Sequence, residues 1–317
     1  MINMLVTTTK KYLQPKTISE ALDFTNEYMD DFKYIAGGTD VVVNNFQGNE
    51  KSECFIDITG IEEMNRVYEY GEYLYIGSLV KLSELKNYPL IKNKFPLIPE
   101  SAAMVGTPLI RNTATIGGNL LCQNRCYYYN QTEWWRESVG FCLKCDGDKC
   151  LATGTSKACY SEFISDIAPA LICLNAEIEI IDINGEKRVK LEEIYSGDGV
   201  NPVNISKTGI LKSILVPLGK DYRYFYKKLR QRESIEFTSL TLAITIDQNK
   251  NLKLTMSGVD PKPVIVIGTD SSDNAGLIKK AINGARSVEN EMLSRKYRRK
   301  MISVFITEGL KKLAKNK

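Results

Sequence analysis

The sequence contains no histidine in its 317 residues. This absence excludes zinc sites that combine histidine with cysteine, and catalysis by Cys-His or Ser-His-Asp arrangements. It also excludes attachment of a flavin through a histidine side chain. Acid-base chemistry in this protein must therefore come from Asp, Glu, Lys or Tyr, or from a cofactor.

Long apolar runs are missing as well, since no stretch approaches the ~18 apolar residues that a membrane span needs. The apolar run in MINMLVTTTKKYLQP is too short for a signal peptide, and its lysines follow the run instead of preceding it. We therefore expect a cytoplasmic protein without membrane contact. In that compartment thiols stay reduced and disulfides are rare.

Two nucleotide-binding motifs are also absent. The sequence has neither G-x-G-x-x-G after a strand nor G-x-x-x-x-G-K-[ST], so neither a Rossmann site nor a P-loop is predicted. The net charge of +4 is small for this length and does not indicate nucleic-acid binding. The basic run RKYRRK (295–300) falls in a predicted helix, and we interpret it as a solvated helix face.

The composition is that of a globular protein, with 43% hydrophobic and 25% charged residues, and the length predicts roughly two domains. Short helices and strands alternate up to Pro217. The stretches YRYFYKKLR, FTSLTLAITID and NLKLTMSGV then have the spacing of a small antiparallel sheet, and two helices follow. This change of character predicts an α+β protein with domains at residues 1–219 and 220–317.

Paired glycines occur in AGGTD (36–40) and in TIGGN (115–119). Such pairs let backbone amides approach an anion without an intervening Cβ, and the neighbouring Thr and Asn side chains can complete a phosphate cradle. Ordinary turn glycines are the alternative interpretation.

Cysteines are concentrated in one segment. Cys54 and Cys173 lie in apolar runs and are expected to be small core residues. The other six fall within residues 122–159, and such density in a reducing compartment indicates a metal site. These six are Cys122, Cys126, Cys142, Cys145, Cys150 and Cys159.

The spacing of these six cysteines permits two kinds of site. In a zinc site, Cys142 and Cys145 would form one knuckle, and Cys122 and Cys126 the other. An iron–sulfur cluster needs only four thiolates that converge from a loop, at irregular spacing. Spacing alone leaves both interpretations open.

Three segments in order, YIAGGTDVVV, LIRNTATIGGNL and SDIAPALICLNAEI, resemble the FAD-binding middle subunit of the molybdenum hydroxylases. This is the family of xanthine dehydrogenase, carbon monoxide dehydrogenase and 4-hydroxybenzoyl-CoA reductase, and the resemblance covers nearly the whole chain. It implies a two-subdomain α+β FAD-binding domain of the PCMH (vanillyl-alcohol oxidase-like) type. A small C-terminal α+β domain, with a three-stranded antiparallel sheet and helices, is implied to follow.

The resemblance also implies which residues contact FAD, and it assigns no catalytic side chain to this chain. From the residues alone, Asp166 is equally well explained as a helix N-cap before APAL. For Lys228 the alternative interpretation is a surface residue of a strand. The implied FAD contacts are Lys33, Tyr34, Ile35, Ala36, Gly37, Gly38, Thr39, Asp40, Thr115, Ile116, Gly117, Gly118, Asn119, Asp166 and Lys228.

Most members of the family connect GGNL directly to the equivalent of DIAPAL, whereas here an insert of about residues 122–159 intervenes. The insert resembles that of the 4-hydroxybenzoyl-CoA reductase β subunit, which carries an additional 4Fe-4S cluster. Ligand sets that include Cys145 or Cys122 remain open. Aromatic residues 127–129 and 134–135 are expected to pack about the cluster and exclude water. The implied ligands are Cys126, Cys142, Cys150 and Cys159.

By resemblance, the chain is an FAD- and 4Fe-4S-containing electron-transfer subunit of a molybdenum-dependent oxidoreductase. A molybdopterin-binding large subunit and a 2Fe-2S small subunit would complete a heterotrimer that dimerises, with ferredoxin as external electron donor. The alternative within the family is the flavin subunit of a purine (xanthine) or aldehyde dehydrogenase that delivers electrons to NAD. Two further classes are an FAD reductase that acts alone, which would lack the cysteine insert, and a zinc-stabilised binding protein.

Overall fold

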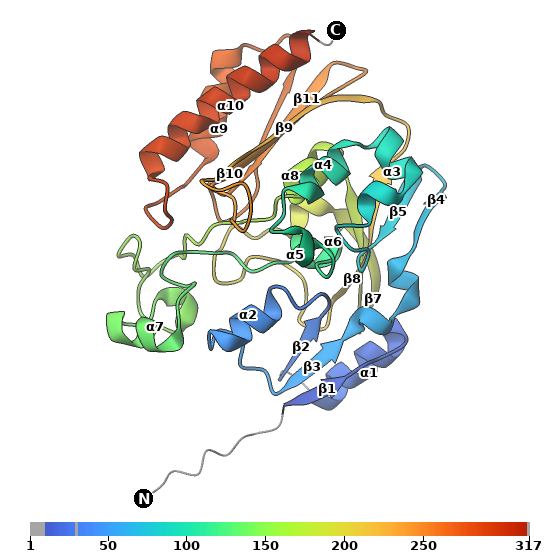
Figure 1. The fold of residues 1–317 in the computed structure, drawn as a ribbon, viewed down its shortest axis with the longest axis vertical. Helices are drawn as coiled ribbons and strands as arrows, with labels where there is room; N and C mark the ends of the chain where they lie inside the picture. Colours follow the sequence, from blue (N-terminus) through green and yellow to red (C-terminus); the bar gives the residue numbers. More distant parts are fainter. Residues whose placement is uncertain (1–9, 29–30, 316–317) are drawn as a thin grey trace, which may run out of the picture.

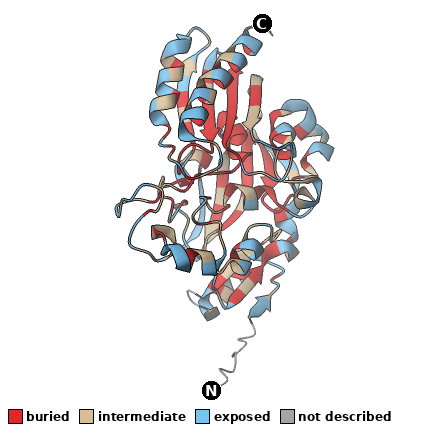
Figure 2. Cartoon of the chain, turned by 60° about the vertical axis from the view of Figure 1, so that its left-hand side comes forward, coloured by how far each residue is buried: buried red, intermediate tan, exposed pale blue. Residues whose placement is uncertain are grey.

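The structure is a computed structural model that describes residues 10–28 and 31–315. Its strands form three sheets, and Figure 1 shows them arranged from the N-terminal end of the molecule to the C-terminal end. Buried residues form a continuous band through the sheets and the helices that pack on them (Figure 2). The predicted α+β class is therefore confirmed.

The N-terminal sheet is parallel and has the strand order β1-β3-β2. The first helix starts after Thr17, whose hydroxyl accepts a hydrogen bond from the amide of Glu20 at 3.1 Å. AGGTD joins β2 to the next helix. The elements are β1 (Lys11–Leu13), α1 (Ile18–Tyr28), β2 (Phe32–Ile35), α2 (Val41–Phe46) and β3 (Cys54–Asp57).

The central sheet is antiparallel, with the strand order β4-β5-β8-β6-β7. Gly71 turns the first hairpin with φ of 58°, a conformation that glycine adopts without strain. Ile183 and Asn184 turn the second hairpin, in which Asp182 pairs with Gly185. The strands are β4 (Val67–Tyr70), β5 (Tyr73–Gly77), β6 (Glu177–Asp182), β7 (Gly185–Lys190) and β8 (Ile210–Pro217).

Short helices pack on the central sheet and supply much of its hydrophobic core. TIGGN forms the start of one of them, with the Thr115 hydroxyl accepting from the amide of Gly118 at 3.1 Å. The helices are α3 (Pro89–Lys94), α4 (Leu97–Ala103), α5 (Pro108–Arg111), α6 (Ile116–Leu120) and α8 (Ala168–Cys173), and 3₁₀ turns occur at Ile58–Gly60, Glu62–Asn65, Leu85–Asn87 and Leu191–Ile194.

The C-terminal sheet has four antiparallel strands, in the order β12-β11-β10-β9, so the expectation of three strands is wrong. The additional strand, β12, follows Pro263 and pairs only with β11. A proline at the start of an edge strand is tolerated because no ladder hydrogen bond depends on its missing N–H. The elements are β9 (Tyr222–Leu229), β10 (Leu240–Asp247), β11 (Asn251–Ser257), β12 (Val264–Thr269), α9 (Asn274–Gly284) and α10 (Arg295–Lys315).

The C-terminal sheet packs directly on helix α8. The Cys173 thiol lies 3.4 Å from the carbonyl oxygen of Ala243 and 3.3 Å from the Thr255 hydroxyl. Cys173 is therefore a core residue, as predicted, and so is Cys54, which is fully buried. The domain boundary at 219/220 stays a prediction. In the described part of the chain, no helix has both the length and the apolar character that crossing a membrane requires.

The cysteine-rich insert forms a separate lobe, shown in green in Figure 1. It contains one helix, α7 (Glu133–Val139), and a 3₁₀ turn at Leu143–Cys145. The remainder is irregular, and its two ends meet at an isolated antiparallel bridge between Arg125 and Glu162.

Candidate functional site

A cavity of about 630 Å³ is lined by the N-terminal sheet, the glycine segments and loops of the central domain. Its size is typical of a site for a small molecule or cofactor. Most of the predicted FAD contacts line it, namely Lys33, Tyr34, Ala36, Gly37, Gly38, Thr39, Asp40, Thr115, Gly117, Gly118, Asn119 and Asp166.

The two glycine segments meet because glycine permits close backbone contact. A Cβ on Gly37 would lie 2.0 Å from the carbonyl oxygen of Thr113, and a Cβ on Gly117 would lie 2.6 Å from the Cβ of Ser78 and 2.9 Å from its carbonyl oxygen. Gly38 has φ of 70°, which a side chain would strain. These glycines therefore hold AGGTD against the segment that leads into TIGGN, and both segments face the same cavity.

Three of the predicted FAD contacts do not line the cavity that the described residues form. The side chains of Ile35 and Ile116 are buried. Lys228 is also buried, with a side chain only 1% exposed, so its interpretation as a surface residue is wrong.

Lys228 reaches the cavity through Asp166. Its Nζ donates to Asp166 Oδ2 at 2.7 Å and to the carbonyl oxygens of Met104 and Glu236, both at 3.0 Å. The Thr241 hydroxyl donates to the other carboxylate oxygen at 2.9 Å. Burial raises the pKa of Asp166, and the Lys228 charge opposes that rise.

Asp166 is not the cap of α8. The hydroxyl of Ser165 accepts the hydrogen bond from the amide of Ala168 at 3.0 Å, at the first residue of the helix. The carboxylate of Asp166 is therefore held by Lys228 and Thr241 at the cavity wall.

The sequence analysis did not identify Arg125 or Asn44, although both line the cavity. Arg125 is 5% exposed, pairs with Asp40 and lies 5.0 Å from the ring centre of Phe237. Its Nε, and the Oδ1 of Asn44, are buried and have no hydrogen-bond partner among the described residues. A buried donor and a buried acceptor without partners fit a polar ligand such as FAD.

Other parts of the lining also carried no recognisable motif. They come from loops far apart in the sequence, at residues 105–106, 200–209 and 235–237. Only the fold brings these loops to one cavity. No signal in a single sequence marks them, since their residue types are those of ordinary loops.

A second, smaller pocket lies in the insert and is lined by the four predicted cluster ligands, Cys126, Cys142, Cys150 and Cys159. We call it the four-cysteine pocket. Cys142, Cys150 and Cys159 are buried, and all eight cysteines of the chain are free thiols. Four thiols around one pocket match the donor set of an iron–sulfur cluster.

The two remaining cysteines of the insert lie outside the four-cysteine pocket. Cys122 lines the large cavity, and burial raises the pKa of its thiol. The Cys145 thiol lies 3.7 Å from Oδ1 of Asn49. The Cys142 and Cys145 thiols are hydrogen-bonded to each other, whereas Cys122 and Cys126 line different pockets, so the second knuckle of the zinc interpretation is not formed.

No group of three or more Cys, Asp or Glu side chains in the described ranges is arranged to hold a single metal ion. The ligands of a 4Fe-4S cluster bind four different irons, so they stand farther apart than the ligands of one ion. The four-cysteine pocket is lined by four thiols, the ligand type of an iron–sulfur cluster.

Two glycines allow the chain to fold tightly around the four-cysteine pocket. A Cβ on Gly199 would lie 2.8 Å from Sγ of Cys159. A Cβ on Gly147 would lie 1.8 Å from the carbonyl oxygen of Phe141, next to Cys142. The close approach of backbone to the Cys159 sulfur therefore depends on glycine at position 199, and the tight contact between backbone segments beside Cys142 depends on glycine at position 147.

The aromatic residues of the insert only partly behave as expected. Tyr128 and Tyr129 line the four-cysteine pocket. Trp135 packs on the neighbouring rings, with 6.1 Å between its centre and that of Tyr127 and 6.4 Å to that of Tyr128. Trp134 is 75% exposed, so the expectation that it excludes water from the cluster is wrong.

Tyr129 and Lys144 line both the four-cysteine pocket and the large cavity. Lys144 Nζ lies 5.0 Å from the ring centre of Tyr129 and donates to Oε1 of Gln123 at 3.1 Å. It also donates to the carbonyl oxygen of Gly199. The two sites are therefore neighbours that share one wall.

Comparison with known proteins identifies the family of the domain that contains the large cavity. A family model described as the FAD binding domain in molybdopterin dehydrogenase matches residues 7–219. The aldehyde oxidoreductase FAD-binding subunit PaoB of Escherichia coli K12 is 28% identical over 258 residues, which are 77% of this chain and 80% of PaoB. The nicotinate dehydrogenase FAD-subunit of Eubacterium barkeri is 25% identical over 75% of this chain and 69% of its own length.

The fold is that of a solved molybdenum enzyme. Carbon monoxide dehydrogenase from Hydrogenophaga pseudoflava, in a form that lacks the Mo-pyranopterin moiety of its cofactor, superposes with a TM-score of 0.71. The match covers 95% of this chain and 96% of that chain at 18% identity, which supports the fold alone. Because the family model matches more than half of the chain, the chain belongs to the FAD-binding domains of molybdopterin dehydrogenases and is an oxidoreductase subunit.

Proposed function

We propose that this chain binds FAD and a 4Fe-4S cluster and is the electron-transfer subunit of a molybdenum-dependent oxidoreductase that resembles 4-hydroxybenzoyl-CoA reductase. The observation that carries the proposal is the four-cysteine pocket, which shares Tyr129 and Lys144 with the large cavity. When bound, the two cofactors supply electron transfer between an external partner and the other subunits of the complex.

In this proposal, the glycine segments 33–40 and 115–119 hold FAD in the large cavity. Asp166 contributes a carboxylate at the cavity wall. Lys228, which does not line the cavity, fixes the position of this carboxylate through their ion pair. Arg125 and Asn44 line the same cavity and add a buried donor and a buried acceptor that have no partner among the described residues. Burial of these groups excludes water from the bound cofactor and strengthens their polar contacts.

The proposed cluster ligands are Cys126, Cys142, Cys150 and Cys159. Four thiolates complete the ligation of a 4Fe-4S cluster, so neither Cys122 nor Cys145 is required. The hydrocarbon and aromatic lining of the four-cysteine pocket limits solvent access, one of the factors that set a cluster's reduction potential.

The partners follow from the family and stay proposals for this chain. They are a molybdopterin-binding large subunit and a 2Fe-2S small subunit, in a heterotrimer that dimerises, with ferredoxin as electron donor. The cytoplasmic location also stays a prediction. The protein should be isolated with its partners, since the identity of the large subunit determines the substrate.

The test is a cofactor analysis of the anaerobically purified chain. Iron, acid-labile sulfide, zinc and flavin are measured on the same sample, and the cluster is identified by its EPR spectrum after reduction. We expect about four irons and four sulfides per FAD, as the composition of the cluster requires. Zinc without iron and flavin would contradict the proposal and favour a zinc-stabilised binding protein.

A second candidate is the flavin subunit of an aldehyde or purine dehydrogenase that passes electrons to NAD. It is favoured by the similarity to PaoB, which is named as a subunit of an aldehyde oxidoreductase. NADH oxidation with an artificial acceptor distinguishes the two. NADH should reduce the flavin rapidly in the second candidate, whereas reduced ferredoxin should do so in the first.

A further inference from the structure

The insert is fixed at a narrow neck where its two ends meet. The amide of Arg125 donates to the carbonyl oxygen of Glu162 at 2.9 Å, and the amide of Glu162 donates back at 2.7 Å. Beside this pair, Nδ2 of Asn124 donates to the carbonyl oxygen of Ser161 at 3.0 Å. Cys126 and Cys159 therefore lie on the two opposite chain segments that meet at this neck.

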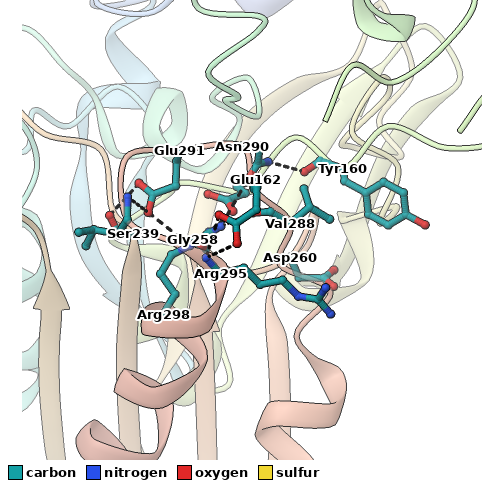
Figure 3. A network of polar contacts seen from close by, with 12 residues as sticks. Tyr160, Glu162, Ser239, Gly258, Asp260, Val288, Asn290, Glu291, Arg295 and Arg298 are labelled. Atoms are coloured by element: carbon teal, nitrogen blue, oxygen red, sulfur yellow. Dashed lines mark hydrogen bonds and ion pairs between the residues drawn. The ribbon is translucent and has the colours of Figure 1, made fainter. Parts of the chain in front are cut away.

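A residue of the C-terminal domain contacts both sides of this neck. The carbonyl oxygen of Asn290 accepts from the amide of Tyr127 at 2.7 Å, one residue after Cys126. The side-chain Nδ2 of Asn290 donates to the carbonyl oxygen of Tyr160 at 2.9 Å, one residue after Cys159 (Figure 3). Asn290 thus spans the first and the last of the four cysteines.

The second of these contacts fixes a peptide group that faces a sulfur atom. The carbonyl oxygen of Tyr160 and the N–H of Ser161 belong to the same planar peptide group. Asn290 binds the Tyr160 carbonyl oxygen of this peptide group, and the Ser161 N–H of the same group donates to Sγ of Cys159 at 3.5 Å. The orientation of this peptide therefore decides whether Cys159 receives a hydrogen bond.

Asn290 is itself held by Arg298, near the start of α10 (Figure 3). Arg298 is fully buried, so the interpretation of RKYRRK as a solvated helix face is wrong at this residue. Its guanidinium pairs with Glu162 and donates to the carbonyl oxygens of Gly258 and Val288 and to Oδ1 of Asn290 at 3.4 Å. A fully buried guanidinium with this many partners rigidifies the neck.

We propose that Asn290 is a positioning residue for the iron–sulfur cluster, so that the C-terminal domain helps to set the reduction potential of a cluster carried by the insert. This inference rests on the proposed function. Hydrogen bonds to cluster sulfur stabilise the reduced, more negative state and raise the reduction potential. Loss of the Asn290 side-chain contact frees the Tyr160–Ser161 peptide, weakens the bond to Cys159 and lowers that potential.

The test uses Asn290→Leu and Asn290→Asp in the full chain, purified anaerobically. Both variants lose the side-chain donor to Tyr160 and keep the main-chain acceptor for Tyr127. Asn290→Asp also preserves the shape of the side chain and the Oδ1 acceptor for Arg298. Asn251→Leu is the matched control, because Asn251 is an exposed residue of the same domain whose Nδ2 binds only Asp247 Oδ2, at 3.0 Å.

Iron, sulfide and FAD contents, the EPR spectrum and the cluster midpoint potential are measured for each protein. We expect both Asn290 variants to shift the ratio of oxidised to reduced cluster several-fold toward oxidised, where tenfold equals about 59 mV for one electron. The EPR spectrum should change as well, and Asn251→Leu should match the wild type. Loss of iron with retention of FAD in both variants would also support the inference.

Two outcomes contradict the inference, and they differ from each other. If both Asn290 variants keep the wild-type EPR spectrum and potential, Asn290 does not position the cluster, and the proposed function stands. If the wild-type protein itself binds no iron, the proposed function and this inference both fail.

Discussion

Lys228 Nζ lies 2.7 Å from Asp166 Oδ2, and both side chains are almost completely buried. The pair joins strand β9 of the C-terminal sheet to the wall of the large cavity, across 62 residues of sequence. The family resemblance assigns both residues to FAD. In the structure only Asp166 lines the cavity, and Lys228 orients it from the opposite side.

We expect Lys228→Met to lower the free energy of unfolding by about 3–5 kcal/mol, because it leaves a buried carboxylate without its counter-charge. The adjacent Lys227→Met is the control, since its ion pair with Glu308 is solvent-exposed and contributes about 1 kcal/mol or less. Urea unfolding measures both. The double variant Lys228→Met/Asp166→Asn should recover part of the loss, and its failure to do so would contradict the pairing argument.

Gly37→Ala should weaken FAD binding more than it weakens the fold. The new Cβ would lie 2.0 Å from the carbonyl oxygen of Thr113, so one glycine segment must move away from the other. We expect at least a tenfold increase in the Kd for FAD, or ~1.4 kcal/mol. Fluorescence titration of the flavin measures this change. Gly219→Ala is the control, because open space surrounds its Cβ position, and equal effects of the two would contradict the prediction.

Serine substitutions distinguish the cluster ligands from the other cysteines. Cys142→Ser and Cys150→Ser should each lose most of the iron and keep FAD, because the two cofactor sites are separate pockets. Cys145→Ser should keep both cofactors. Iron and flavin are determined on each purified variant. If Cys145→Ser removes the iron while Cys150→Ser does not, the proposed ligand set is wrong.

Lys144→Gln should lower the reduction potential of the cluster. The Lys144 side chain forms part of the wall of the four-cysteine pocket, where a positive charge favours the reduced, more negative cluster. Removing about 1 kcal/mol of this attraction corresponds to roughly 40 mV for a one-electron couple. A redox titration followed by EPR measures the shift. The exposed Lys157→Gln serves as control, and equal potentials in the two variants would exclude a specific role of Lys144.

The network around Arg298 should make stability depend on pH. Glu162 and Glu291 share the Arg298 guanidinium, and the nearby Asp260 is already paired with Arg286 at 2.8 Å. Burial raises the pKa of Glu162 to about 8 from its usual value of 4.5, and it also raises the pKa of Glu291. Between these two pH values the folded protein therefore holds a proton that the unfolded chain releases. The reason is that the single positive charge of Arg298 faces the two carboxyl groups of Glu162 and Glu291.

A carboxyl group with a raised pKa in the folded state contributes stability that is complete below pH 4.5 and lost as the pH rises to about 8. We expect the wild type to lose about 1–3 kcal/mol of unfolding free energy relative to Glu291→Gln over this range, since the variant has one carboxyl group for one guanidinium. Urea unfolding at pH 5, 6.5 and 8 measures the difference. If the unfolding free energies of the wild type and Glu291→Gln change equally with pH, the argument that two carboxyl groups share the Arg298 guanidinium is wrong.

The sequence by itself determined the features that depend on local residue types. AGGTD and TIGGN were recognisable as paired glycines that permit close backbone contact, and the family resemblance predicted that they contact FAD. The absence of histidine limited the insert to all-cysteine chemistry. The α+β class and the family also followed, because ordered motifs and apolar patterns persist in a single sequence.

Only the tertiary structure decided which residues act together. Asp166 is separated from Lys228, and Arg125 from Asp40, by more than 60 residues, and no local pattern records such pairs. The same holds for Arg298, whose surrounding basic run is typical of an exposed helix face. Its burial depends on the way α10 meets the neck of the insert, because a charge is buried only where the fold gathers enough partners around it.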